Sequence, residues 1–331
     1  MRRLLVLLVV ALGLAPGTWW RSPRTPDDTR QLLTVRAITA PRVELGPLEA
    51  AGAWQLYSPN SSFNSYSALV AFDDGTLLAA SDRGGFLRFS PPGEPPAPVR
   101  IGMFANSKSR AKRDADIEAM TRDPATGRLW AAFEKSNKIA GFDQALSALG
   151  AIRPRAMRNW PENQGPEAMV RLVDGRFIVL AEGSPRWFDD GMPGVLFAAD
   201  PVAGGAPIPF RFVPPAGYRP VDLAQMPDGK VLILLRKVDW GLPPHFRGKL
   251  MLADPAAIRA GTSWRARALA DLAEPLPSDN YEGLAALSDG HGGAIVWLIS
   301  DDNGMAYQRT LLLRLRWPAR EKARGSPRAP R

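Results

Sequence analysis

The stretch NYEGLAALSDGHGGAIVWLISDDN, from Asn280 to Asn303, has the pattern that decides the fold. Glu282 opens an apolar run, a glycine-rich turn follows, and a second apolar run ends at Asp301. Two short apolar runs joined by a turn that contains Asp-Gly predict a β-hairpin. Such a hairpin would have an acid at the same end of each strand.

The same pattern recurs four more times along the chain. The copies are FNSYSALVAFDDGTLLAASDRG (63–84), RDADIEAMTRDPATGRLWAAFEKSN (113–137), NQGPEAMVRLVDGRFIVLAEG (163–183) and RPVDLAQMPDGKVLILLRK (219–237). The opening positions are Ser67, Glu118, Glu167, Asp222 and Glu282, and successive openings are 51, 49, 55 and 60 residues apart. The closing positions are Asp82, Glu134, Glu182, Arg236 and Asp301. We therefore predict hairpins over 67–82, 118–134, 167–182, 222–236 and 282–301.

Two more strand-like runs follow each of the first four hairpins, such as GFLRF and PVRIGMF after the first. Four strands in a period of about 50 residues are typical of a β-propeller blade. We predict an all-β propeller of four-stranded antiparallel blades, five or six in number, closed by the N- and C-terminal strands. AWQLYS (53–58) would complete the last blade, and LLTVRAIT (32–39) is left for a sixth. A β-sandwich would not explain one motif at such regular spacing.

The N-terminus has the composition of an export signal. Arg2 and Arg3 precede an apolar run, Leu4 to Ala15, which is shorter than the roughly 20 residues that span a bilayer. No clear A-x-A cleavage site follows, so an uncleaved anchor over residues 4–15 stays open. We expect a signal peptide or anchor at 1–20, a flexible linker at 21–31, the propeller at 32–317 and a basic disordered tail at 318–331. The protein would be periplasmic or secreted by a bacterium.

The formal net charge of +9 lies mostly in the two ends of the chain. Residues 1–30 carry +3 and residues 318–331 carry +4, so the excess does not mark a basic folded face. We expect no nucleic-acid partner, membrane contact only through the N-terminal segment, and a monomer. The chain has no cysteine, which excludes disulfides and thiolate metal sites.

Two familiar chemistries lack their residues. The only histidines are His245 and His291, too few for a multi-histidine zinc site. No serine is flanked by glycine on both sides, so the G-x-S-x-G elbow of serine hydrolases is missing. The sequence assigns no catalytic residue. Trp130, Trp187, Trp240 and Trp297 are expected to pack in or around the blades.

The acids of one hairpin are predicted to face each other. In a tight hairpin, paired residue numbers have a constant sum, and both Asp174 with Gly175 and Glu167 with Glu182 sum to 349. In a propeller these strand ends surround the channel, which predicts a ring of acids at one mouth. Like charges placed opposite each other destabilise a sheet, whereas Ca²⁺ takes 6–8 oxygen ligands and would neutralise them. The expected metal ligands are Asp82, Glu118, Glu134, Glu167, Glu182, Glu282 and Asp301.

Basic residues lie beside these acids in the sequence. They are Arg83, Lys135, Arg236 and Lys237. In one interpretation they bind an anionic substrate that the metal also holds. In the other they pair with the acids, and the strand ends are simply solvated.

Several motifs taken together resemble a known family. D-x-E-A-M (116–120), Q-G-P-E-A-M (164–169), N-Y-E-G-L (280–284) and S-D-D-N (300–303) are similar to those of the phytase-like domain, "esterase-like activity of phytase", from about Ser58 to Trp317. The resemblance implies an exported bacterial propeller and, by analogy with β-propeller phytases, six blades and Ca²⁺-dependent action on phosphoesters. Ser67 and Arg236 depart from the pattern, because they stand where other blades have acids.

The function expected from these features is an exported hydrolase that depends on a divalent metal. Its substrate would be a small anionic or ester compound, a phosphoester or a related ester, bound at an acidic channel mouth. The alternative is a non-catalytic propeller of the bacterial envelope that binds a ligand or a protein.

Overall fold

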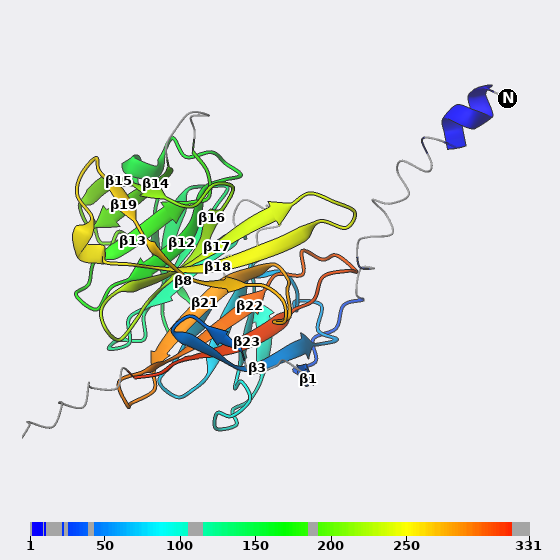
Figure 1. Ribbon diagram of the computed structural model, residues 1–331, viewed down its shortest axis with the longest axis horizontal. Coiled ribbons are helices and arrows are strands. Elements are labelled where there is room, and N and C mark those ends of the chain that lie inside the picture. The colour runs from blue at the N-terminus through cyan, green and yellow to red at the C-terminus, as the bar shows by residue number, and fades with distance from the viewer. Residues whose placement is uncertain are drawn as a thin grey trace, which may run out of the picture.

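The computed structural model describes residues 2–8, 10, 22, 26–38, 43–104, 115–184 and 191–319. Within these residues the chain forms five sheets arranged as a β-propeller (Figure 1). Among the described residues, the only 3-10 helices are η3 (Arg155–Met157) and η4 (Pro255–Ala257). The predicted all-β propeller with antiparallel blades is confirmed, and the number of blades is five.

The first four blades follow one another along the chain. Blade 1 consists of β4 (Tyr66–Ala71), β5 (Leu77–Ser81), β6 (Gly85–Phe89) and β7 (Arg100–Met103). Blade 2 consists of β8 (Ile117–Arg122), β9 (Leu129–Phe133), β10 (Lys138–Phe142) and β11 (Ala148–Ile152). Blade 3 consists of β12 (Pro166–Arg171), β13 (Phe177–Ala181), β14 (Met192–Phe197) and β15 (Pro207–Val213). Blade 4 consists of β16 (Arg219–Gln225), β17 (Val231–Asp239), β18 (His245–Ala253) and β20 (Arg267–Leu272).

Two short strands depart from the simple repeat. β19 (Ser263–Arg265) comes from the connection between β18 and β20, but it adds to the outer edge of blade 3, parallel to β15. β2 (Glu44–Leu45) pairs only with β3 (Leu48–Tyr57).

Blade 5 combines distant parts of the sequence. Its inner strands are β21 (Tyr281–Ser288), β22 (Ala294–Ser300) and β23 (Leu311–Trp317). β3 pairs antiparallel with β23, and β1 (Thr34–Ile38) pairs in turn with β3. The run at 32–39 therefore supplies an outermost strand of blade 5. The alternative of a sixth blade, which the family resemblance favoured, is wrong.

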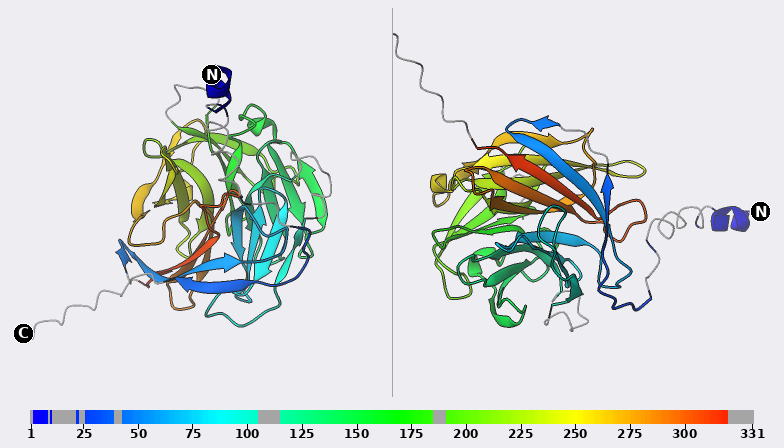
Figure 2. Two further views of the ribbon diagram at one scale, coloured as in Figure 1. Left: turned by 90° about the vertical axis from the view of Figure 1, so that its right-hand side faces the viewer. Right: turned by 90° about the horizontal axis from the view of Figure 1, so that it is seen from below.

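The innermost strands β4, β8, β12, β16 and β21 contact one another in a ring around a central channel. Figure 2 (left) looks onto the face where these strands begin. Five clusters of buried apolar side chains fill the spaces between neighbouring blades. The turns of the first hairpins need a positive φ, which glycine provides at Gly75 (81°) and Gly175 (88°).

Two of the four tryptophans pack as expected, and one does not. Trp130 and Trp297 are 3% and 1% exposed, within the interblade clusters. Trp240 is 89% exposed, so the prediction was wrong for this residue. It lies in the loop between β17 and β18, which extends past the end of its blade (Figure 1). Trp187 lies outside the described residues.

The ends of the chain are only partly described. Residues 26–31 contain no strand but hydrogen-bond to the propeller, since the Gln31 side chain bonds to the backbone of Ile101 and Asn60 Nδ2 donates to the Arg30 carbonyl. The expected basic tail falls outside the described residues after residue 319. Among the described residues, no helix combines the length and the apolar character that crossing a membrane requires.

Candidate functional site

Each innermost strand begins at the same end of the channel with a β-bulge. The pairing of the first two strands shifts by one residue at Ser67, Glu118, Glu167, Val221 and Glu282. A bulge places two residues opposite one and turns the side chain of the extra residue. Three of the five bulge residues are glutamates that are 6–9% exposed. We call this end of the channel the acid mouth and the opposite end the far mouth.

The bulge corrects the predicted register. Glu167 and Glu182 are not cross-strand partners, because the Glu182 N–H donates to the Gly165 carbonyl at 2.9 Å. In the same way the Glu134 N–H donates to the Asp116 carbonyl, and not to Glu118. The rule that paired residue numbers have a constant sum fails here, because it holds only where the two strands pair without a bulge. The acids still converge, since the bulge directs the extra glutamate toward the channel.

For blade 4, the predicted opening position, Asp222, is one residue later than the bulge that corresponds to the openings of the other blades. Its bulge residue is Val221, whereas Asp222 corresponds to Ala68, Ala119, Ala168 and Gly283 of the other blades. Val221 is buried in the apolar cluster between blades 4 and 5. Blade 4 therefore supplies no acid at the position where blades 2, 3 and 5 supply a glutamate.

Two overlapping groups of three carboxylates form at the acid mouth. Asp116, Glu118 and Glu134 bring one oxygen each within 4.8 Å of one another, and so do Glu134, Glu167 and Glu182. All five residues are buried, and Glu134 belongs to both groups. Asp116, only 1% exposed, was missed by the sequence reasoning. Asp116 could have been predicted from its position two residues before Glu118, because this position lies at the start of the inner strand.

Three cations compensate part of this charge, and one of them is Arg219, whose Nη1 donates to Glu182 Oε2 at 3.1 Å. Lys135 Nζ donates to both oxygens of Asp116 at 2.8 Å. Arg236, at the closing position of blade 4, bonds to Glu182 Oε1 at 2.8 Å and also to Glu282. Burial lowers the pKa of Arg236, but the carboxylates of Glu282 and Glu182 outweigh burial and raise it. This side chain is therefore a fixed positive charge between blades 3 and 5.

The acids hold protons more tightly than free carboxylic acids. Burial, followed by the neighbouring carboxylates, raises the pKa of Glu118, Glu167 and Asp301 well above the usual value. Burial also raises the pKa of Glu282, although Arg236 opposes the shift. For Glu134, burial is again the main cause and raises the pKa to about 7. At neutral pH the site thus carries more carboxyl groups than its cations can hold ionised.

The two remaining basic candidates do not enter the cluster. The Arg83 side chain is 53% exposed, and its Nε lies 3.9 Å from Asp82 Oδ1 at the rim. Lys237 follows Arg236 on β17, so its side chain points to the opposite face of the strand. It lies 3.6 Å from Asp239 in the part of the hairpin that projects beyond the acid mouth.

Asp222 lies inside the channel and is completely buried. Its Oδ1 accepts the Leu223 N–H and its Oδ2 accepts the Leu284 N–H of blade 5, at 2.8 and 2.7 Å. Burial raises the pKa of this carboxyl, while these bonds and one from the Leu69 N–H of blade 1 lower it in part. One carboxylate therefore links the inner strands of three blades. The small residues at the equivalent positions leave the space that it occupies.

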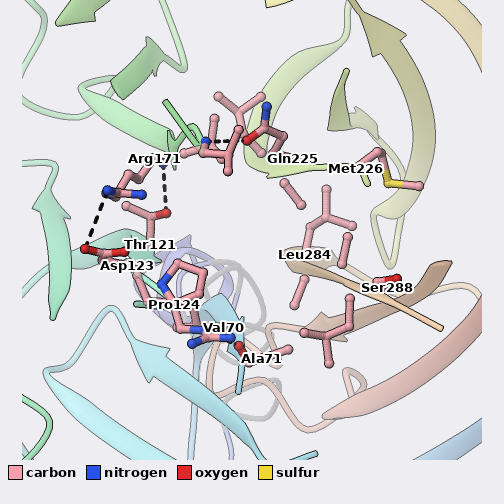
Figure 3. Close-up of a pocket in the computed structure, with 18 of the residues that line it drawn as sticks. Val70, Ala71, Thr121, Asp123, Pro124, Arg171, Gln225, Met226, Leu284 and Ser288 are labelled. Atoms are coloured by element: carbon pink, nitrogen blue, oxygen red, sulfur yellow. Dashed lines mark hydrogen bonds and ion pairs between the residues drawn. The ribbon is translucent and has the colours of Figure 1, made fainter. Parts of the chain in front are cut away.

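The far mouth opens into a cavity of about 600 Å³ with a different character. Figure 3 shows how its polar residues contact one another. Arg171 Nη2 lies 3.5 Å from Asp123 Oδ2, and the backbone N–H of Arg171 donates to Thr121 Oγ1. Gln225 Oε1 accepts the Val173 N–H. Most of the other lining residues are apolar, such as Leu284. The charged residues of this cavity are paired with one another, Arg122 with Asp73 and Arg171 with Asp123, so the acid mouth is the stronger candidate for chemistry.

A basic cleft of about 490 Å³ adjoins the acid mouth beside blade 2. Its lining includes Lys135, Arg153, Arg155 and Arg158, and the three arginines form no ion pair with the described residues. The run AIRPRAMR (151–158) shows this charge in the sequence, but its arginines follow the outer strand β11 and lie outside the repeated motif. Lys135 contacts both the cleft and Asp116, so the two features are continuous.

A family model for "Phytase-like: Esterase-like activity of phytase" matches residues 61–304. The chain belongs to this family. The match includes every bulge residue and every closing residue of the acid mouth. No curated protein matches the chain.

Solved structures of other propellers resemble this phytase-like chain at low sequence identity. The PQQ-bound aldose sugar dehydrogenase of Streptomyces coelicolor has 12% identity and a TM-score of 0.48, covering 87% of this chain and 99% of that one. The glutaminyl cyclase of Myxococcus xanthus has 12% identity and a TM-score of 0.48, covering 81% and 96%. The gluconolactonase XC5397 of Xanthomonas campestris has 12% identity and a TM-score of 0.46, covering 89% and 98%. Likeness at this level does not establish chemistry.

Proposed function

We propose that this phytase-like propeller is a divalent-cation-dependent hydrolase of phosphoesters or related esters, with its site at the acid mouth. The observation that carries the proposal is the pair of buried carboxylate triads that share Glu134. Burying like charges together is costly unless a cation compensates them. The arrangement therefore suits a site that binds a cation more than one that only stabilises the fold.

The residues fit a hard cation such as Ca²⁺. All the donors are carboxylate oxygens, which Ca²⁺, Mg²⁺ and Mn²⁺ prefer over softer metals. Lys135 and Arg236 already hold Asp116, Glu182 and Glu282. Within the described residues, Glu118, Glu134 and Glu167 form no ion pair. We therefore assign the cation to the side of the mouth formed by blades 2 and 3, with Asp82, Glu282 and Asp301 farther around the ring.

Each group would have a separate task in hydrolysis. A bound cation would neutralise charge on the ester oxygens and lower the pKa of bound water. The chain's own carboxyl groups hold and orient that cation. In the cation-free protein the pKa of Glu134 is about 7, so this residue would release a proton when a cation binds at neutral pH.

The basic cleft supports an anionic substrate. Arg153, Arg155 and Arg158 offer guanidinium groups that can bind a phosphate or carboxylate with two hydrogen bonds. The largely buried Trp160 and the acid Glu162 also line the cleft. We infer that the substrate's charged end lies in the cleft while its ester reaches the carboxylates beyond Lys135.

We also propose export, on the basis of Arg2, Arg3 and the apolar run that follows. The partner would be a small molecule, the protein would act as a monomer, and no nucleic acid would be involved. Fractionation of the native host tests whether the protein is exported. Recovery of the full-length chain in the cytoplasm alone would contradict it.

Calorimetric titration with Ca²⁺, together with hydrolysis of p-nitrophenyl phosphate and short-chain p-nitrophenyl esters, tests the function. We expect heat on Ca²⁺ addition and hydrolysis that a chelator abolishes. Glu134→Gln should lose both, and Asp174→Asn should lose neither, because Asp174 is an exposed turn residue paired with Arg176. Silent titrations at millimolar Ca²⁺ would overturn the metal site. Binding without hydrolysis of any ester would favour the non-catalytic alternative.

A further inference from the structure

The hairpin of β17 and β18 continues beyond the acid mouth. Arg236 lies at the level of the mouth, and the pairs Lys237–Arg247, Val238–Phe246 and Asp239–His245 extend the ladder past it. Three more residues in each strand correspond to about 10 Å. The loop at 240–244 therefore forms a tip that stands clear of the propeller (Figure 1). Trp240 and Leu242 at this tip are 89% and 85% exposed.

Other exposed apolar side chains lie on the same face. Among the described residues between 26 and 319, the large apolar side chains that are exposed are Leu32, Tyr57, Met103, Leu149, Val173, Trp240 and Leu242. Strand directions place five of these seven at the acid-mouth face, because β7 ends at Met103, β3 ends at Tyr57, and Leu32 accepts a hydrogen bond from Ser58. Leu149 and Val173 lie at the other end of their strands. The apolar surface is therefore concentrated on one side of the molecule.

The chain also enters the propeller on this face. The Ser22 N–H donates to the Gly304 carbonyl at 2.9 Å, and Gly304 lies in the loop between β22 and β23 at the acid mouth. The sequence before Ser22 contains the apolar run that begins at Leu4, preceded by two arginines. A membrane that held this run would be tethered to the propeller at the acid-mouth end.

Exposed cations lie at the tip and at the rim of the same face, each beside a carboxylate. Lys237 and Arg247, at the base of the tip, share one carboxylate, Asp239, which leaves the tip with net positive charge. Arg83 adds another half-exposed cation at the rim. Anionic headgroups attract such basic side chains, and tryptophan favours the boundary between headgroups and hydrocarbon.

We propose that the acid-mouth face docks on an anionic lipid bilayer, with Trp240 and Leu242 inserted at the interface. A bilayer fits this tip better than a protein partner, because stable protein interfaces bury roughly 1,200–2,000 Å² and a tip with two apolar side chains offers far less. Interfacial anchoring needs only a small apolar area together with attraction between opposite charges. The proposal is independent of any catalytic activity at the acid mouth.

The absence of natural cysteine permits a direct test in the full chain. Leu242→Cys and Val173→Cys place a fluorescent NBD label at matched positions, 85% and 83% exposed, on opposite faces. With vesicles of phosphatidylglycerol and phosphatidylethanolamine, we expect a blue shift at position 242 and none at 173. Phosphatidylcholine vesicles should give a smaller shift. The pair Trp240→Ser and Leu242→Ser should lower vesicle partitioning by about tenfold, from the lost apolar area.

Four results would overturn the proposal. Co-flotation with vesicles and no shift at either label would mean attachment through the N-terminal segment alone. Equal shifts at both labels would mean non-specific adsorption. A shift at 242 that grows with protein concentration without lipid would assign the tip to a second copy of the chain. An equal response to phosphatidylcholine would remove the role of anionic headgroups.

Discussion

At the acid mouth, blade 2 contributes Glu118 and Glu134, whereas blade 4 contributes Val221 and Arg236 at the corresponding positions. Both blades have the same four-stranded sheet and the same bulge. The difference reverses the sign of the charge that each directs toward the mouth. Blade 4 therefore neutralises its neighbours, through the contacts of Arg236 with Glu182 and Glu282.

This difference shows why the ring of acids is not uniform. The carboxylates near blade 4 have a permanent cation, and those near blade 2 depend on Lys135, which is occupied by Asp116. On the side of blades 2 and 3, the unmatched charge thus lies on Glu118, Glu134 and Glu167. A single cation bound there would neutralise the acids of blades 2 and 3, as Arg236 neutralises Glu182 and Glu282 on the other side. The predictions below test the two sides separately.

Removal of Arg236 should have the largest effect on stability. Arg236→Met keeps most of the side-chain volume but leaves Glu282 without its cation and Glu182 with Arg219 alone. Breaking a buried pair in this way costs about 3–5 kcal/mol. Urea unfolding of the variant measures the loss, with Arg176→Met on the surface of blade 3 as the control. A loss below about 1 kcal/mol, the value typical of a surface pair, would remove the contrast between the blades.

The cation-free protein should lose stability as the pH rises. A carboxyl whose pKa is higher in the folded state contributes stability that is complete below its unfolded pKa and lost as the pH rises through its folded pKa. For Glu134 this window runs from about 4.5 to about 7. In chelator, the melting temperature should therefore be a few degrees lower at pH 8 than at pH 5. Ca²⁺ should restore most of the loss, and a flat or rising profile in chelator would contradict the assignment.

Glu167→Gln should have opposite effects with and without metal. It removes one ligand, so Ca²⁺ affinity and any Ca²⁺-dependent hydrolysis should fall. It also removes repulsion without leaving a cavity, so the metal-free variant should be more stable by about 0.5 kcal/mol. Paired melting curves in chelator and in Ca²⁺ measure both effects. If Glu167 only solvates a strand end, the variant will show no metal effect and a small loss of stability.

The smallest expected effect separates the basic cleft from the hairpin. Arg158→Ala should raise KM for an anionic ester a few-fold while kcat stays unchanged, because it removes binding that substrate and transition state share. Lys237→Ala should leave both constants unchanged, since its side chain points away from the acids. Arg83→Ala should raise KM less than Arg158→Ala does, because Arg83 lies at the rim of the mouth. An equal rise in KM for Lys237→Ala would mean that substrate reaches the projecting hairpin.

The fold was predictable because its signals are local. Each hairpin has its own Asp-Gly or Pro-x-Thr-Gly turn and its own alternation of short apolar runs, and regular spacing turns five hairpins into a propeller. No local signal predicts the number of blades. As β1 shows, a strand-like run can extend an existing sheet instead of beginning a new one. The exposure of Trp240 was hidden for a similar reason. Nothing in its neighbours says that β17 and β18 continue past the mouth.

The sequence by itself determined that the opening and closing residues of the blades meet at one mouth, since a repeated motif places equivalent residues at equivalent ends of successive blades. Only the tertiary structure decided how they meet. The bulge added one residue to each inner strand, shifted blade 4 by one position, and brought Asp116 into the cluster. It also decided which acids Arg236 neutralises. Distances between side chains from different blades set these charge balances, and no spacing along the chain encodes them.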